Sequence, residues 1–284
     1  MDLRDPPVGQ PSGHSVFPGF VARSRALGEA RDRLAGADPA FNRWSADDPV
    51  WASGMTATTY ASADAALADV PDGATILVGG FVSAGSPSNL LLALQRQGAR
   101  ELTAIANNVG LGDKLDALAE SRQLVRVIAT FAIRASGSRR SHFESQYHAG
   151  EVALELSPQG TLVERIRAGG AGLGGVLTRT GLGTLLAEGK ETVRVGGVDY
   201  LLETPLRADF ALIKAYQADT LGNLTYRRAG RNFNPVMATA ADIVIAEVEE
   251  IVEPGRLDPE RIGTQAVFVD RLVRCDPMEV RRDG

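Results

Sequence analysis

The chain has 284 residues, of which 44% are hydrophobic and 23% charged, and a net charge of −5. This composition is typical of a globular protein with a sizeable core, and the absence of a basic stripe excludes nucleic acid as an expected partner. No apolar run approaches the length of a membrane-spanning helix, so no membrane association is expected. Cys275 is the single cysteine and there are three histidines, so we predict no disulfide, no metal site and a cytoplasmic protein.

The first 54 residues differ from the rest of the chain. They contain six of the fourteen prolines and little apolar periodicity. We therefore predict an N-terminal extension over residues 1–54 that is disordered or loosely packed. The folded domain is predicted to span residues 55–284, starting at Met55.

Helices and strands are predicted to alternate from residue 61 to residue 169. The apolar runs predict strands at 75–80, 101–108, 124–130 and 151–157. Between them, amphipathic patterns and caps predict helices at 61–70, 88–98, 112–121, 139–150 and 159–169. Such an order is typical of an α/β fold with a mainly parallel open sheet and flanking helices.

The second half of the chain has a different pattern. Residues 169–184 contain seven glycines in sixteen positions, which predicts a long loop. A β-hairpin is expected at 191–203 around Gly196 and Gly197. Further strands are predicted at 208–219, 222–227 and 242–253, with a short helix at 234–241.

The stretch "GGFVSAGSP" (79–87) directly follows the first predicted strand. It matches neither the dinucleotide fingerprint nor the phosphate loop of nucleotide-hydrolysing enzymes. Exposed backbone N–H groups and the start of the next helix would suit an anion or a developing oxyanion. A tight turn that needs small residues explains the same pattern, and the residues alone leave both interpretations open.

The pattern "DGATILVGGFVSAGSP" (72–87) resembles the signature of the alpha subunit of family I coenzyme A transferases, the 3-oxoacid and 3-oxoadipate enzymes. The resemblance extends over residues 55–273. Gly230 interrupts a usually unbroken segment, and residues 131–143 are longer and richer in Arg and Ser than is usual. The further matching stretches are "NNVG" (107–110), "PQGTLVERIRAGGAG" (158–172), "GTLLAEGKE" (183–191), "ADFALIKA" (208–215), "AGRNFNPVMATAAD" (229–242), "EVEEIVEPG" (247–255) and "VDRLV" (269–273).

The resemblance implies a coenzyme A site and an acyl site. The loop it assigns to coenzyme A consists of Gly79, Gly80, Phe81, Val82, Ser83, Ala84 and Gly85. Asn107 and Asn108 end a predicted strand, where their amides either line the acyl site or cap the next loop. Arg134 is a candidate for binding a distal carboxylate, or belongs to a solvated cluster. Residues 231–234 form either a wall of the active site or a structural corner.

The chemistry of this family needs a glutamate nucleophile that forms a glutamyl–coenzyme A thioester. In two-subunit members that glutamate lies on the beta subunit in a Ser-Glu-Asn-Gly context, which is absent from this chain. Glu247 and Glu249 are interpreted as strand residues, and Glu250 and Glu253 as surface charge. We therefore expect no catalytic residue on this chain and a beta-subunit partner, in a heterodimer or heterotetramer.

The resemblance implies transfer of coenzyme A from succinyl-CoA to a 3-oxoacid, with 3-oxoadipate favoured over acetoacetate. Coenzyme A thioesters are expected as substrates, without a permanently bound cofactor. Two alternatives remain: a sugar-phosphate isomerase of similar fold, which needs its acid and base on this chain, and a non-catalytic acyl-CoA-binding protein.

Overall fold

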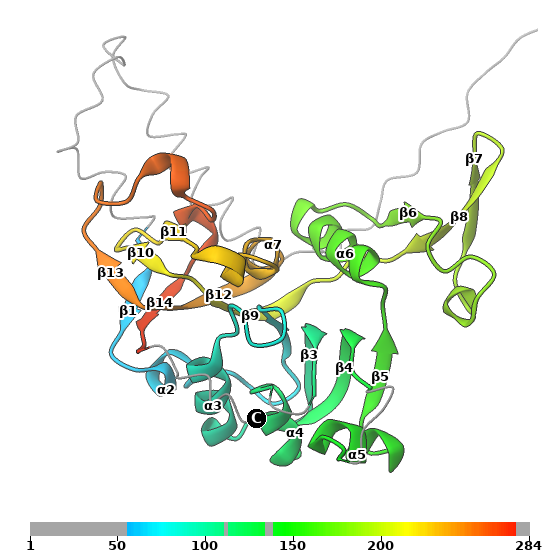
Figure 1. Ribbon diagram of the computed structural model, residues 1–284, viewed down its shortest axis with the longest axis horizontal. Helices are drawn as coiled ribbons and strands as arrows, with labels where there is room; N and C mark the ends of the chain where they lie inside the picture. The colour runs from blue at the N-terminus through cyan, green and yellow to red at the C-terminus, as the bar shows by residue number, and fades with distance from the viewer. Residues whose placement is uncertain (1–55, 111–112, 134–138, 277–284) are drawn as a thin grey trace, which may run out of the picture. The chain divides into compact units, whose positions relative to one another are not determined.

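The computed structural model describes residues 56–110, 113–133 and 139–276 (Figure 1). The predicted extension over residues 1–54 and the candidate Arg134 lie outside the described residues. No helix within the described part of the chain is long and apolar enough to cross a membrane.

The centre of the fold is an eight-stranded sheet, and every neighbouring pair of its strands is parallel. The predicted parallel α/β sheet is thereby confirmed. In spatial order the strands are β1 (Thr58–Tyr60), β14 (Arg271–Arg274), β12 (Ala241–Val248), β9 (Ala208–Lys214), β2 (Thr75–Val78), β3 (Leu102–Asn108), β4 (Leu124–Phe131) and β5 (Ala153–Leu156).

Helices cover both faces of this sheet, which is why its strands are apolar on both sides. Successive residues of a strand point to opposite faces, so Ile76 and Val78 belong to one buried cluster and Leu77 to the other. The first cluster packs under α2 (Ala63–Ala66), α3 (Ser88–Gln97), α4 (Asp116–Glu120) and α5 (His142–His148), and the second under α6 (Gln159–Ala171) and α7 (Asn234–Ala238).

Capping residues fix several helix ends, and the sequence predicts two of them, at Ser62 and Gly98. Ser62 caps α2 by accepting a hydrogen bond from the N–H of Ala65 at 3.1 Å. Gly98 ends α3 with a φ of 88°, a left-handed conformation that glycine adopts without strain. Ser141 and Glu144 form a capping box at the start of α5.

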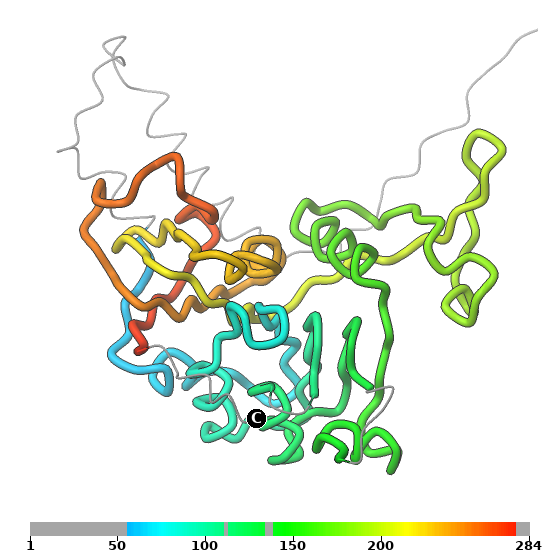
Figure 2. The backbone as a smooth tube through the Cα atoms, viewed as in Figure 1, coloured from blue at the N-terminus to red at the C-terminus, as the bar shows by residue number. Residues whose placement is uncertain are grey.

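Two smaller sheets complete the fold. The predicted hairpin is confirmed as β7 (Thr192–Val195) and β8 (Val198–Glu203), which join β6 (Val176–Thr178) in an antiparallel sheet beyond α6 (Figures 1 and 2). The other sheet contains β10 (Gln217–Asp219), β11 (Leu224–Thr225) and β13 (Glu250–Val252).

The long strands predicted at 208–219 and 242–253 are wrong, because each is divided between two sheets. β9 and β12 pair in the large sheet, and their continuations β10 and β13 pair in the small one. The break falls at residues 215–216 in one strand and at Glu249 in the other, where the N–H of Glu249 donates to Tyr216 O at 3.0 Å. Two paired strands therefore bend at the same point.

The long loop predicted at 169–184 is also wrong in part. α6 continues to Ala171, and β6 lies within the same stretch. A Cβ on Gly169 would lie 1.9 Å from Leu206 O, and one on Gly170 would lie 2.5 Å from Thr239 Oγ1. These two glycines thus allow the last turn of a helix to pack closely, which a glycine count alone does not distinguish from a loop.

Candidate active site

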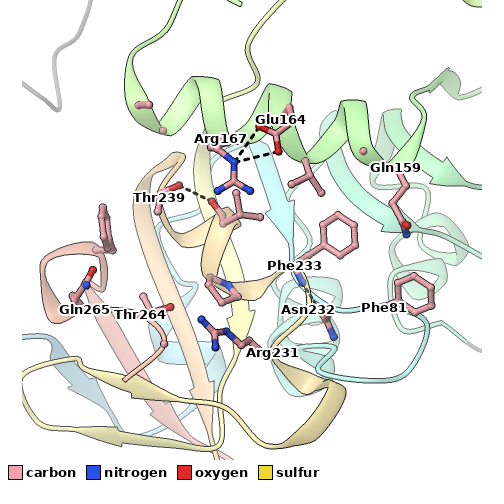
Figure 3. A pocket seen from close by; sticks show the side chains of 18 residues that line it. Phe81, Gln159, Glu164, Arg167, Arg231, Asn232, Phe233, Thr239, Thr264 and Gln265 are labelled. Atoms are coloured by element: carbon pink, nitrogen blue, oxygen red, sulfur yellow. Dashed lines mark hydrogen bonds and ion pairs between the residues drawn. The ribbon is translucent and has the colours of Figure 1, made fainter. Parts of the chain in front are cut away.

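An open pocket of about 870 Å³ lies between α6, α7 and the segments beside them (Figure 3). Phe81 of the predicted coenzyme A loop lies at this pocket, together with Arg231, Asn232 and Phe233. The remaining lining residues are Gln159, Gly160, Val163, Glu164, Arg167, Gly170, Ala171, Pro235, Val236, Thr239, Gly263, Thr264, Gln265 and Phe268.

The segment Gly79–Gly85, hereafter the glycine loop, follows β2 at the carboxyl edge of the sheet. Its centre is a tight turn in which Phe81 and Ala84 exchange two backbone hydrogen bonds of 3.0 Å. Val82 has a φ of 53°, an unfavourable conformation for a β-branched residue that costs of the order of 1–3 kcal/mol. A turn of this kind needs support from outside itself.

The glycines of this loop allow it to pack against a distant part of the chain. A Cβ on Gly79 would lie 1.8 Å from Asn234 Oδ1, and one on Gly85 would lie 2.4 Å from Gly230 O. Gly80 and Gly85 also have positive φ, at 112° and 66°. The glycines therefore meet a steric need of the fold, whatever the loop binds.

Residues 231–234 support the glycine loop and also form part of the pocket wall. Asn232 donates to Ala84 O at 2.9 Å, and Asn234 donates to Gly85 O at 3.0 Å. Asn234 is fully buried and accepts from the N–H of Lys214, whereas Arg231 and Phe233 line the pocket. Arg231 and Phe233 thus line the pocket, Asn234 forms a structural corner, and Asn232 does both.

Asn107 and Asn108 lie at the end of β3 beside the glycine loop. Asn108 Oδ1 accepts from the N–H of Val82 at 2.7 Å and from Asn107 Nδ2 at 3.0 Å. Asn107 is buried, and its Oδ1 accepts from Gln159 Nε2 at 2.8 Å. Gln159 lies at the start of α6 and at the pocket, so the amides connect the loop to the pocket wall.

Glu247, interpreted from the sequence as a strand residue and not as the nucleophile, has a fully buried side chain. Its carboxylate accepts from the N–H groups of Asn89 and Leu90 at the start of α3, at 2.8 and 3.1 Å. The Asn89 amide and Lys214 Nζ donate to its second oxygen, at 2.8 and 3.1 Å. The helix end that would suit an anionic ligand thus already holds a carboxylate of the protein.

The charges at the pocket come from both walls. Arg167 pairs with Glu164 at 3.1 Å on α6, and Arg231 lies on a separate segment (Figure 3). Asp113, behind the glycine loop, and Tyr226, which is hydrogen-bonded to Thr264 of the pocket, both have raised pKa values, mainly because they are buried. Desolvation by burial raises the pKa of Asp113 to about 6, and Asp116 acts in the same direction.

The sequence did not single out Gln159, Arg167 or Asp113. Gln159 is part of the matching stretch "PQGTLVERIRAGGAG", but no feature of that stretch indicates a pocket. Arg139 and Arg140, neighbours of the candidate Arg134, are exposed. No group of three His, Cys, Asp or Glu side chains within the described ranges is arranged to hold a metal ion.

Comparison with solved structures places this fold among known ones. Glutaconate coenzyme A-transferase from Acidaminococcus fermentans superposes with a TM-score of 0.69 at 21% identity, covering 78% of this chain and 76% of that one. The decarboxylase AibA/AibB superposes with a TM-score of 0.67 at 29% identity, covering 78% and 84%.

Comparison of sequences gives closer relatives. The chain is 51% identical over 220 residues to one of the subunits of the 3-oxoadipate CoA-transferase of Pseudomonas putida, covering 77% of this chain and 94% of that protein. It is 50% identical over 224 residues to the corresponding chain of the succinyl-CoA:3-ketoacid coenzyme A transferase of Xanthomonas campestris pv. campestris, covering 78% and 90%. Residues 60–274 match the family described as "Coenzyme A transferase", and the chain belongs to that family.

Proposed function

We propose that this chain is the alpha subunit of a two-subunit 3-oxoacid CoA-transferase that moves coenzyme A from succinyl-CoA to a 3-oxoacid. One observation carries the proposal: Phe81 of the glycine loop and residues 231–233 meet at one pocket, in a chain about half identical to one type of subunit of such enzymes. The pocket volume of about 870 Å³ is within the usual range for small-molecule sites, roughly 300–1,000 Å³.

The glycine loop is the part of this chain that we assign to the thioester. The backbone N–H groups of Ser83 and Gly85 donate to no other group in the described part of the chain. Donors fixed by a rigid turn polarise a carbonyl and stabilise the charge that develops on its oxygen. Phe81, 42% exposed at the pocket, offers an apolar surface to the pantetheine arm.

The glutamate that accepts coenzyme A is proposed to lie on the partner subunit. Glu247 is buried and fully hydrogen-bonded, and Glu249 pairs with Arg227 at 2.8 Å. Glu164 is the one carboxylate among the described pocket residues, and Arg167 neutralises it. A nucleophile must instead be accessible and poised beside the thioester.

An apolar surface near the glycine loop supports a partner at this edge of the sheet. Phe81 and Val82 follow β2, Phe131 ends β4 and Leu156 ends β5, and these side chains are 42%, 62%, 57% and 47% exposed. Because β2, β4 and β5 are parallel, these residues lie along one edge. Obligate interfaces of this kind bury roughly 2,000 Å² or more.

The acceptor is proposed to be 3-oxoadipate, with acetoacetate as the next candidate. The relatives also include the alpha chain of the acetate CoA-transferase of Escherichia coli, 47% identical over 203 residues, so acceptor choice varies among similar chains. A distal carboxylate suits a guanidinium fork. Arg134 stays the candidate from the sequence, and Arg167 and Arg231 are the arginines at the pocket.

The test is co-expression of this chain with a second chain that carries a Ser-Glu-Asn-Gly segment. The pair is assayed with succinyl-CoA and either 3-oxoadipate, acetoacetate or acetate, and each chain is assayed alone. We expect transfer only by the pair, and a trapped glutamyl adduct, found by mass spectrometry after borohydride treatment, only on the partner. A trapped glutamate on this chain, or carbon dioxide release without transfer, would contradict the proposal.

A further inference from the structure

The conformation of Val82 depends on a side chain from a neighbouring strand. Val82 is exposed and has a φ of 53°, and its N–H donates to no backbone acceptor of the turn that it belongs to. That N–H donates to Asn108 Oδ1 at 2.7 Å, at the end of β3. The unfavourable part of the glycine loop is therefore attached to the sheet by one amide oxygen.

The orientation of the Asn108 amide is determined by its partners. Its oxygen accepts from two donors, the N–H of Val82 and Asn107 Nδ2, so its nitrogen must face an acceptor. That acceptor is Asp113 Oδ2. The other carboxylate oxygen of Asp113 accepts from the N–H of Leu115 at 3.0 Å, which fixes the carboxylate in turn.

The charged groups around Asp113 do not replace Asn108 as the side-chain partner of its carboxylate. Lys114 and Asp116 are the charged residues that act on Asp113, and they oppose each other. Asp116 itself is engaged by the N–H groups of His142 and Phe143 at the start of α5. No cation pairs with Asp113 within the described ranges, so the Asn108 amide is its main side-chain partner.

From this geometry we propose that Asn108 is a positioning residue that holds the glycine loop in its acyl-CoA-binding conformation, and that Asp113 orients the Asn108 amide. The expected effect on turnover rests on the proposed function, whereas the expected effect on the conformation of the loop does not. Asn107 and Gln159 continue this series of hydrogen-bonded amides to α6, so one network fixes the position of the loop relative to the pocket wall. Neither Asn108 nor Asp113 needs to touch the substrate.

The first experiment measures the loop directly, by hydrogen exchange of the peptide covering residues 79–86 in the full chain. In Asn108→Ala the Val82 N–H loses its acceptor, and we expect exchange to be faster by about tenfold or more. Gln97→Ala is the matched control, because Gln97 is also an amide that accepts a backbone N–H, from Ala99 at 2.8 Å. Unchanged exchange in Asn108→Ala would overturn the proposal, whatever reaction the enzyme catalyses.

The second experiment exchanges the two side chains. Asn108→Asp keeps an oxygen for the Val82 N–H, but its second oxygen faces the Asp113 carboxylate and is repelled by it. Because this displaces the loop, we expect kcat/KM of the assembled enzyme to fall by about 100-fold. In the double variant Asn108→Asp, Asp113→Asn the donor and acceptor are reversed, and we expect recovery to within about fivefold of the wild type.

These results test the pairing of Asn108 with Asp113 separately from the proposed function. Recovery in the double variant with normal exchange of residues 79–86 supports the pairing of Asn108 with Asp113. A double variant no better than Asn108→Asp, with the fold intact by circular dichroism, would overturn it. Absence of any transfer by the wild-type pair would refute the proposed function, while the exchange measurement would still decide whether Asn108 holds the loop.

Discussion

The buried carboxylate of Glu247 should stabilise the fold and take no part in the chemistry. In Glu247→Gln, one oxygen that accepts hydrogen bonds becomes an NH₂ group, and Lys214 loses the partner that neutralises it. Lys214 has 17% of its side chain exposed, so the unpaired charge is largely desolvated. Loss of one partner from a buried ion pair typically costs about 3–5 kcal/mol.

We therefore expect the free energy of unfolding of Glu247→Gln, from urea denaturation of the full chain, to fall by about 3–5 kcal/mol. Glu249→Gln is the control, because Glu249 pairs with the exposed Arg227 and its loss should cost at most about 1 kcal/mol. Folded Glu247→Gln, assembled with the partner, should keep its transfer activity. A loss of activity without a loss of stability would refute this reasoning and indicate that Glu247 takes part in the reaction.

Three further predictions concern other buried contacts. Because burial raises the folded-state pKa of Asp113 to about 6, its stabilising contribution is complete below the unfolded pKa of 3.8 and is lost as the pH rises through 6. Relative to Asp113→Asn, urea titrations should show the wild type losing about 2 kcal/mol between about pH 4.5 and pH 7.5. Arg165→Met leaves buried Glu203 without one of its cations and should cost about 3 kcal/mol by the same assay. Gly79→Ala places a Cβ 1.8 Å from Asn234 Oδ1, and calorimetry should show a melting temperature lower by several degrees, about 5 °C or more.

Each of these predictions has a result that contradicts it. A pH profile of Asp113→Asn parallel to that of the wild type would mean that Asp113 is not desolvated. The control for Arg165 is Arg96→Ala, since Arg96 and Asp64 are both exposed and the loss of their pair should leave the free energy of unfolding nearly unchanged. Equal costs for the two arginines would contradict the assigned burial, and an unchanged melting temperature of Gly79→Ala would contradict the packing of the loop.

The parallel sheet could be predicted from the sequence because its signals are local. Strands buried on both faces are continuous apolar runs such as "TILV", and Ser62 and Gly98 mark helix ends by their own chemistry. The division of the long strands could not be predicted. It depends on two paired strands bending together at residues 215–216 and 249, which no window of sequence contains.

The place of the glycine loop in the fold could be predicted, but the contacts that hold it could not. The glycine loop follows a strand of the predicted sheet, which locates it at the carboxyl edge. The reason for Gly79 lies in Asn234, which is distant in the sequence. Glu247 is confirmed as a strand residue, but its burial against the start of α3 and Lys214 depends on segments outside its own apolar run "DIVIAEV".

The pairing of β1 with β14 has a consequence for how the chain folds. Thr58 lies opposite Arg271, so the first strand of the sheet finds its partner only when almost all of the described chain is present. The other edge of β2, away from β3, likewise stays unpaired until β9 is made, because Ile76 pairs with Phe210. Contacts over such long separations slow folding and leave strand edges exposed meanwhile. During synthesis, β2–β5 can assemble early because they pair in chain order. β1 joins the opposite edge of the sheet last, once β14 has been made.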